Sequence, residues 1–211
     1  MELLAKQITQ AKDMFLKNEK YFLFILIIVF YFFASKAYSA SGDKAEALNY
    51  LSSLSDFSAS FIQSDGNNLS EGKVYIGKKR VRAEYFLPTK ILIILAEDKA
   101  MYYDYELEED EFFNPKNTNA WFIYDIFRNP YFFEDGKVEV ENNELLLEKK
   151  GIDNEEKNFV IRVLFEKQPL ILRGIEVVVN DDILKLSIYN HSYNDVFDKN
   201  FFKLINPNFL N

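Results

Sequence analysis

Residues 70–88 read SEGKVYIGKKRVRAEYFLP, and this stretch indicates the fold class. Apolar side chains occupy every second position, at Val74 and Ile76 before the basic turn and at positions 81, 83 and 85 after it. A period of two is typical of strands that have one apolar face and one polar face. Because only a short turn separates the two segments, we expect them to pair as antiparallel neighbours.

The same strand rhythm extends along the chain in both directions. Segments rich in Val, Ile, Tyr and Phe fill residues 57–107, and further segments follow residue 130: KVEVEN, LLLEKK, NFVIRVLFEK, LILRGIEVVVN, ILKLSIYNHS and the Phe-rich FFKLINP. Between them, EDGK and VNDD have the composition of hairpin turns. The chain therefore predicts a long meander of antiparallel strands that closes with FFKLINP.

Two segments depart from this rhythm and predict helices. Residues 43–54 place one alanine and three leucines on one face, at positions 47, 48, 51 and 54, with Asp43 as the cap at the start. In the middle of the chain, residues 121, 122, 125 and 126 fall at helical spacing behind Thr118 and Asn119, either of which suits an N-cap.

Together these elements predict a mainly β protein. We expect a strongly curved antiparallel sheet, an incomplete or half β-barrel, that wraps around an N-terminal helix and a short helix in the middle of the sequence. A curved sheet of this kind can hold an apolar ligand on its concave side. No linker or internal repeat divides residues 40–211, which we expect to form one domain.

The first 39 residues resemble a leader. Residues 21–33, YFLFILIIVFYFF, carry no charge, Lys17 and Lys20 precede them, and the small-residue stretch ASKAYSASG follows. This is the pattern of a secretory signal peptide, cut after Ser39 or Ala37, with Met14 as a possible true start. The alternative is a retained anchor, but a spanning helix needs roughly 20 apolar residues. The prediction is cleavage and export to the periplasm.

The composition excludes several function classes. The chain has no cysteine, which removes disulfides, thiol nucleophiles and cysteine-based metal sites. Its net charge is −8, and because residues 1–39 hold five lysines and three acidic residues, the remainder has 20 basic and 30 acidic side chains, a net −10. An acidic domain is a poor partner for nucleic acid, where affinity rests on cationic side chains.

Catalytic signatures are equally sparse. The single histidine, His191, lies in the polar segment YNHSYND, which favours a solvated surface residue. The acidic run ELEEDE at 106–111 is better explained as a charged hairpin edge than as a metal site. No nucleophile elbow, phosphate loop or dinucleotide motif occurs in the chain. We therefore predict a protein that is not an enzyme and uses neither cofactor nor metal.

Residues from about 45 to 207 resemble the outer-membrane lipoprotein carrier (LolA) family in the order of their features. The segments that carry the resemblance are LSSLSDFSASFIQSD at 51–65, the strand pair at 70–88, ILIILAEDKAMYYDYELEE at 91–109 and SIYNHSYNDVFDKNFFKLINP at 187–207. Two departures stand out. The family's Pro-Gly turn is replaced by the run KKRVR, and its Asp-Gly hairpin reads Asp98-Lys99.

The resemblance implies a monomeric periplasmic chaperone that binds the acyl chains of lipoproteins and moves them from the inner to the outer membrane. Its partners would be acylated lipoproteins, the inner-membrane lipoprotein-releasing ABC transporter and an outer-membrane lipoprotein receptor. Each methylene kept from water is worth about 0.8 kcal/mol, so such cargo needs an escort. The receptor of this fold is anchored through a lipidated cysteine, and the absence of cysteine argues against that role.

The resemblance and the strand pattern together nominate lipid-contacting residues. The family's functional arginine falls within the basic run 78–82, where Arg80 and Arg82 rank first. The candidates for the lining are aromatic and aliphatic side chains of the central strands and the middle helix: Tyr85, Phe86, Ile91, Ile93, Leu95, Met101, Tyr103, Trp121 and Phe122. For each of them an ordinary place in a filled core is the competing interpretation.

Two other functions fit the same pattern. One is a periplasmic lipid-binding or envelope-stress-sensing protein built on the same half-barrel. The other is a periplasmic lipid hydrolase, which would need a base beside its nucleophile, and His191 is the only histidine available.

Overall fold

The structure is a computed structural model that describes residues 42–129, 131–153 and 156–209. Residues 43–211 form one compact unit. The predicted signal peptide (1–39), its possible start at Met14 and its cut sites lie outside the described residues. Among the residues that are described, no helix has both the length and the apolarity needed to cross a bilayer.

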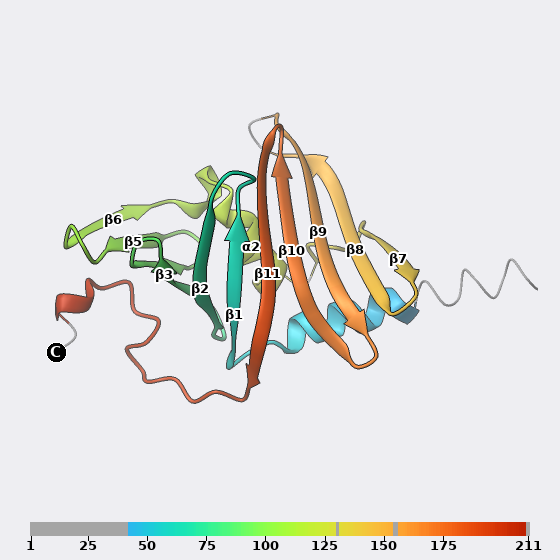
Figure 1. The fold of residues 1–211 in the computed structure, drawn as a ribbon, viewed down its shortest axis with the longest axis horizontal. Helices are drawn as coiled ribbons and strands as arrows, with labels where there is room; N and C mark the ends of the chain where they lie inside the picture. Colours follow the sequence, from blue (N-terminus) through green and yellow to red (C-terminus); the bar gives the residue numbers. More distant parts are fainter. Residues whose placement is uncertain (1–41, 130, 154–155, 210–211) are drawn as a thin grey trace, which may run out of the picture. The chain divides into compact units, whose positions relative to one another are not determined.

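A single antiparallel sheet dominates the fold (Figure 1). Its eleven strands in the described ranges are β1 (Phe57–Ser64), β2 (Leu69–Ile76), β3 (Val81–Leu87), β4 (Ile91–Leu95), β5 (Ala100–Asp104), β6 (Glu109–Phe113), β7 (Lys137–Glu141), β8 (Glu144–Ile152), β9 (Asn158–Lys167), β10 (Leu170–Val179) and β11 (Asp182–Tyr193). They lie in the order β6-β5-β4-β3-β2-β1-β11-β10-β9-β8-β7. Because β6 and β7 remain as free edges, the barrel is incomplete, and the predicted fold class is confirmed.

The strand pair predicted from residues 70–88 forms as expected. Val74 pairs with Ala83 and Ile76 with Val81, and the turn is closed by a 2.9 Å hydrogen bond from the Gly77 amide to the Arg80 carbonyl. The acidic run at 106–111 forms the turn into β6 and part of that exposed edge strand. Charged residues at an edge discourage pairing with another sheet, so the predicted hairpin edge is confirmed.

Two helices, as predicted, accompany the sheet: an N-terminal helix, helical over residues 42–53, and α2 (Ala120–Arg128). Two short 3-10 helices, η1 (Pro115–Asn117) and η2 (Pro207–Phe209), complete the described elements. The N-terminal helix buries Ala47, Leu51 and Leu54, and α2 buries Phe122 and Ile126 against the same core as the strands. This core lies on the concave face of the sheet, which both helices cover.

Of the two residues predicted to cap α2, Asn119 occupies the N-cap position, but neither provides a side-chain cap. Asp43 lies within the helical residues, and its carboxylate forms an ion pair with Lys167, with Oδ1 and Nζ 2.8 Å apart. The hydroxyl of Thr118 donates to the Pro115 carbonyl at 3.0 Å, and Asn119 makes no side-chain cap hydrogen bond. Thr118 instead ends η1, which takes its own cap from Asn114. Thr118 has an extended backbone and separates η1 from α2.

The C-terminal segment, residues 194–209, packs on the opposite, convex face. A second apolar cluster there contains Leu92, Ile94, Met101 and Tyr103, with Leu204 of the C-terminal segment against it. In Figure 1 the segment leaves β11 and runs back toward β3 and β6. FFKLINP, at 201–207, forms turns rather than the predicted strand. Its backbone amides donate hydrogen bonds to nearby carbonyls, and the carbonyls of Phe201 and Phe202 accept hydrogen bonds from arginine side chains of β3 and of the turn before it.

Candidate functional site

An apolar cavity of about 180 Å³ lies between α2 and the concave face of the sheet. Sixteen residues line it, and of these only Gln63 and Asn119 carry an amide side chain. The other fourteen are Phe61, Val74, Val81, Ala83, Tyr85, Ile93, Leu95, Ala120, Ile123, Phe127, Ile175, Leu184, Leu186 and Ile188. Several other pockets of the described residues are as large, so the apolar lining and not the volume distinguishes this cavity.

Strand alternation and helical spacing build this cavity. Along β3 the apolar side chains at 81, 83 and 85 point inward, and Ile93 and Leu95 continue the same face on β4. From the other side, Ala120, Ile123 and Phe127 of α2 face the sheet at steps of three and four residues. Alanine at both 83 and 120 leaves the space between strand and helix open.

Two of the polar side chains in the cavity bind each other. The Tyr85 hydroxyl donates to Gln63 Oε1 at 2.7 Å, and burial raises the pKa of Tyr85 to about 12. The phenol therefore stays neutral. Its ring meets Phe61 edge to face, with the centroids 5.1 Å apart. The wall presented to a ligand is apolar, which suits a hydrocarbon chain.

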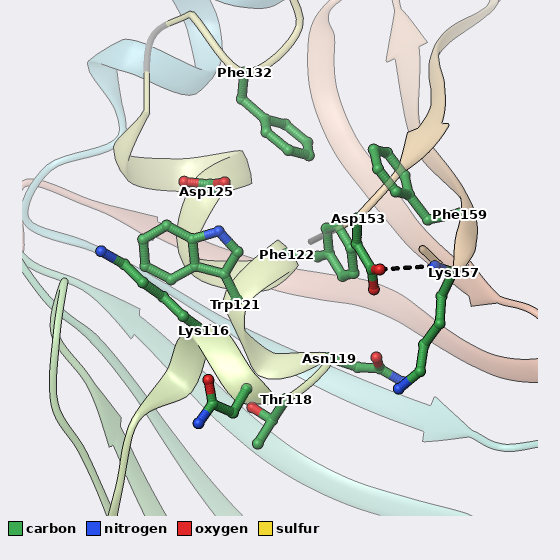
Figure 2. A pocket seen from close by; sticks show the side chains of 11 residues that line it. Lys116, Thr118, Asn119, Trp121, Phe122, Asp125, Phe132, Asp153, Lys157 and Phe159 are labelled. Atoms are coloured by element: carbon green, nitrogen blue, oxygen red, sulfur yellow. Dashed lines mark hydrogen bonds between the residues drawn. The ribbon is translucent and has the colours of Figure 1, made fainter. Parts of the chain in front are cut away.

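A second pocket of about 190 Å³ lies at the first turns of α2, and we call it the Asp125 pocket (Figure 2). Lys116, Asn117, Thr118, Asn119, Trp121, Phe122 and Asp125 line one side, and Phe132, Asp153, Lys157 and Phe159 complete it. Figure 2 shows Trp121 and Asp125 across the pocket from Asp153 and Lys157. Asn119 lines both this pocket and the apolar cavity.

Asp125 is the unusual group of this pocket. The residue is only 7% exposed, and burial raises the pKa of its carboxyl to about 6. Hydrogen bonds from Asn129 and Trp121 and the charges of Lys116 and Lys149 oppose that rise. Lys149 itself pairs with Asp135 at 2.5 Å, so it does not neutralise Asp125 directly.

The structure divides the predicted lipid-contacting residues among several places. Tyr85, Ile93 and Leu95 line the apolar cavity, and Trp121 and Phe122 line the Asp125 pocket. The remaining candidates lie elsewhere. Met101 and Tyr103 belong to the convex cluster, Ile91 is half-buried outside both pockets, and Phe86 is 48% exposed.

The two predicted arginines face away from the apolar cavity. Arg80 donates to the Phe202 carbonyl, and Arg82 donates to the Phe201 carbonyl at 2.6 Å. The Arg82 guanidinium also lies 4.3 Å from the centre of the Phe201 ring and pairs with Glu84. Both side chains therefore hold the C-terminal segment against the convex face.

Sequence reasoning missed the α2 and C-terminal-strand walls of the cavity. Positions 120, 123 and 127 share one helical face, a signal that the sequence does contain. Ile175 comes from β10, and Leu184 and Leu186 come from β11. Strand β11 pairs with β1, which is more than 100 residues away in the sequence, so no local pattern predicts this part of the lining.

His191 is not the solvated residue that its neighbours predict. The side chain is half-buried, its Nε2 lies 2.6 Å from the Leu172 carbonyl oxygen, and its ring contacts Phe57 and Tyr193. Burial lowers the pKa of its imidazole. Neither pocket has a histidine or serine in its wall, and the described residues hold no group of three or more acidic or histidine side chains placed to bind a metal.

No protein-family model matches the chain, and no curated protein matches it in sequence. Among solved structures, an uncharacterized conserved protein from Thermus thermophilus is similar over 77% of this chain and 93% of its own, with 10% identity and a TM-score of 0.50. The likeness is one of fold.

Two structures of MucB bound to MucA are also similar. MucB in complex with the MucA(peri) segment has 6% identity and a TM-score of 0.43, over 78% of this chain and 59% of its own. The Pseudomonas aeruginosa MucA/MucB complex has 5% identity and a TM-score of 0.41, over 75% and 60%.

Proposed function

We propose that this protein is a non-enzymatic binding protein that holds an acyl chain in the apolar cavity. The observation that carries the proposal is the lining itself, in which fourteen of sixteen residues present hydrocarbon or aromatic surface. Burial of apolar surface is worth about 25 cal/mol per Å² and about 0.8 kcal/mol per methylene. A chain segment that enters this cavity therefore gains several kcal/mol relative to water.

The cavity volume limits how much chain can enter. An engineered apolar cavity of about 150 Å³ binds benzene, so about 180 Å³ holds a segment of one chain. A longer chain would extend past the half-buried residues of the lining or would need α2 to move outward. The Arg128 end of α2 is tied down, because this guanidinium donates to the carbonyls of Gly77, Lys78 and Leu54. Entry would therefore occur at the Asn119 end.

The finer proposal is a carrier of lipoproteins in the periplasm. It is supported by the predicted signal peptide and by the resemblance of residues 45–207 to the LolA family. In this proposal the protein takes acylated lipoproteins from the inner-membrane ABC transporter and passes them to the outer-membrane receptor. Residues outside the cavity, including Phe86 and Ile91, would then contact cargo only after the cavity opens.

A second candidate function is favoured by the size of the cavity. Space for part of one chain fits a single-chain lipid better than a triacylated lipoprotein. A lipid-binding or envelope-stress-sensing protein would use the same cavity without transporting protein cargo.

A matched pair of tryptophan variants on β11 tests chain binding. Leu186 points into the cavity, whereas Ser187, the next residue, is exposed on the other face. We expect Leu186→Trp to weaken binding of a fluorescent twelve-carbon fatty acid at least tenfold and Ser187→Trp to leave it unchanged. Circular dichroism checks that both variants fold. If both variants bound the fatty acid as tightly as the wild type, the cavity would be excluded as the binding site for the acyl chain.

A release experiment then separates the two functions. The protein, expressed from the full-length chain, is incubated with inner-membrane vesicles, and soluble complexes are analysed by mass spectrometry. Acylated protein recovered at about one per carrier supports lipoprotein transport. Free lipid alone supports lipid binding or sensing and contradicts the carrier proposal.

A further inference from the structure

Aromatic rings surround the Asp125 pocket. The centroid of Phe122 lies 4.9 Å from that of Phe159 and 6.5 Å from that of Phe132. Phe159 lies over Gly151 on the neighbouring strand, where a β-carbon would come within 2.6 Å of the ring. The wall is therefore built from large rings, one of which depends on a glycine behind it.

A buried carboxylate lies among these rings without a cationic partner. No ion pair within the described ranges includes Asp125, although the residue is almost fully buried. A buried carboxylate is costly unless it is paired or protonated. Burial raises the pKa of Asp125 to about 6, so the hydrogen bonds from Asn129 and Trp121 do not compensate for the absence of an ion pair.

An ammonium group is the ligand chemistry that this arrangement fits. It would pair with the carboxylate, and aromatic rings attract alkylammonium groups through their π faces, as in the cages that bind choline or methylated lysine. The rings of this pocket already attract such groups, since Lys116 Nζ lies 5.0 Å from the Trp121 ring and Lys149 Nζ lies 5.3 Å from the Phe132 ring.

The mouth of the same pocket carries the opposite charge. Lys116 is exposed, lines the pocket and extends alongside Trp121 (Figure 2). An exposed ammonium at a pocket mouth is suited to a phosphate. A ligand that meets both features presents an ammonium for the interior and a phosphate for the mouth.

The Asp125 pocket also adjoins the apolar cavity. Asn119, directly before α2, lines both, although the helical face that bears Trp121 and Asp125 points away from the face that bears Ala120 and Ile123. The Asn119 side chain makes no cap hydrogen bond, so its amide is available to a ligand. A molecule with its head at Asp125 and its chain in the cavity would pass this residue.

We propose that the Asp125 pocket binds the zwitterionic head, an ammonium and a phosphate, of an amphiphile whose acyl chain occupies the apolar cavity. This inference rests on the proposed function, because it assigns the head group of the molecule whose chain the cavity holds. Asp125 binds the ammonium, Lys116 binds the phosphate, and Asn119 lies where the chain joins the head. A primary and a quaternary ammonium share this chemistry, and the experiment distinguishes them.

Displacement of a bound fluorescent fatty acid tests the proposal. The competitors are four single-chain lipids with the same acyl chain: lysophosphatidylethanolamine, lysophosphatidylcholine, lysophosphatidylglycerol, which lacks the ammonium, and monoacylglycerol, which lacks both charges. We expect at least one zwitterionic lipid to displace the probe at a tenfold lower concentration than lysophosphatidylglycerol. The better of the first two identifies a primary or a quaternary ammonium.

Two variants and one control assign the charges to residues. Asp125→Asn is expected to reduce the tenfold preference for the zwitterionic lipid over lysophosphatidylglycerol to less than threefold. Displacement by lysophosphatidylglycerol itself should not change. Lys116→Gln is expected to raise about threefold or more the concentration at which each of the three phosphate-bearing lipids displaces the probe. Displacement by monoacylglycerol should be unchanged. Asp135→Asn is the control, because this exposed acid lies outside the pocket and pairs with Lys149. It should keep the wild-type preference.

The outcomes separate this proposal from the proposed function. Displacement by all four lipids at similar concentrations would overturn the head-group proposal and leave chain binding intact. A preference that survives Asp125→Asn would overturn it as well. Failure of every lipid to displace the probe, or failure of the probe to bind, would overturn both.

Discussion

Phe61 and Gly72 face each other across β1 and β2, and the phenyl ring lies over the glycine. A β-carbon at Gly72 would clash with the backbone carbonyl oxygen of Glu84 and would come 2.5 Å from Phe61 Cζ. The same relationship recurs between Phe159 and Gly151 on β9 and β8. Phe61 forms a wall of the apolar cavity and Phe159 a wall of the Asp125 pocket. Each glycine therefore determines how far its phenyl ring withdraws from the space inside the half-barrel.

Gly72→Ala is expected to lower the free energy of unfolding by about 1–3 kcal/mol or more, the usual cost of overpacking, because the Phe61 ring must move toward the cavity and the backbone of β3 at Glu84 must also shift. Urea denaturation measures this loss, and binding of the fluorescent fatty acid should weaken in parallel. Ser70→Ala on the same strand is the control and should change stability by less than about 0.5 kcal/mol. An unchanged urea midpoint for Gly72→Ala would contradict the prediction and would show that the sheet accommodates the extra methyl group without loss of stability.

Asp125 should make stability fall as pH rises. Burial raises the pKa of this carboxyl in the folded state to about 6, above its ordinary value of 3.8. The folded state then binds more protons than the unfolded state between these values, so the contribution decreases from about pH 4 to pH 6. Asp125→Asn should match the wild type near pH 4 and exceed its unfolding free energy at pH 7.5, by on the order of 2 kcal/mol.

Asp195 provides a control with the opposite sign. Although burial acts to raise it, the pKa of Asp195 is held below its ordinary value by hydrogen bonds from Ser192 and Ser58. Stability from this group is present at neutral pH and is lost as the pH falls. Asp195→Asn should therefore destabilise the protein at pH 7.5 and less so toward pH 3. If the free energy of unfolding changed with pH in the same way for Asp125→Asn and Asp195→Asn, the directions assigned to both pKa shifts would be contradicted.

Arg82 should act on the C-terminal segment rather than on chain binding. Lysine at this position loses the stacking on Phe201 and part of the bonding to the Phe201 carbonyl and Glu84. We expect Arg82→Lys to increase hydrogen exchange in residues 194–209 and to lower stability by about 1–2 kcal/mol. Fatty-acid affinity should be unchanged. A loss of affinity would instead support a lipid-binding role for this arginine.

Arg173 is the matched control for that variant. It pairs with Glu166 on the exposed surface, where ion pairs contribute about 0–1 kcal/mol. Arg173→Lys should leave both hydrogen exchange of the C-terminal segment and the denaturation midpoint close to those of the wild type.

His191 can be followed directly, because it is the only histidine in the chain. Burial lowers the pKa of its imidazole below the ordinary 6.5. Its contribution to stability is therefore present above pH 6.5 and is lost as the pH falls toward the folded-state pKa. A single NMR titration curve should have its midpoint below 6.5. A midpoint at or above 6.5 would indicate that the ring is solvated, as the sequence alone predicts.

Several elements could be predicted because their signals are local. The alternation in residues 70–88 and the spacing of residues 121–126 depend only on near neighbours, and both predicted the correct element. The Thr118 hydroxyl does not cap α2, because it binds the Pro115 carbonyl of η1, an interaction that cap statistics do not include. Tyr85, Ile93 and Leu95 were named as candidates for the lining, but their direction could not be predicted from the strand pattern alone.

The sequence by itself determined which residues form strands and which neighbouring residues point to opposite faces. The tertiary structure alone decided which face became the cavity. Strands β4 and β5 are apolar on both faces, so period-two alternation does not separate Leu92 from Ile93 or Met101 from Tyr102. Pairing with β3 turns Ile93 inward and Met101 outward. The outward face is then covered by a segment about 100 residues away, a contact that no local pattern encodes.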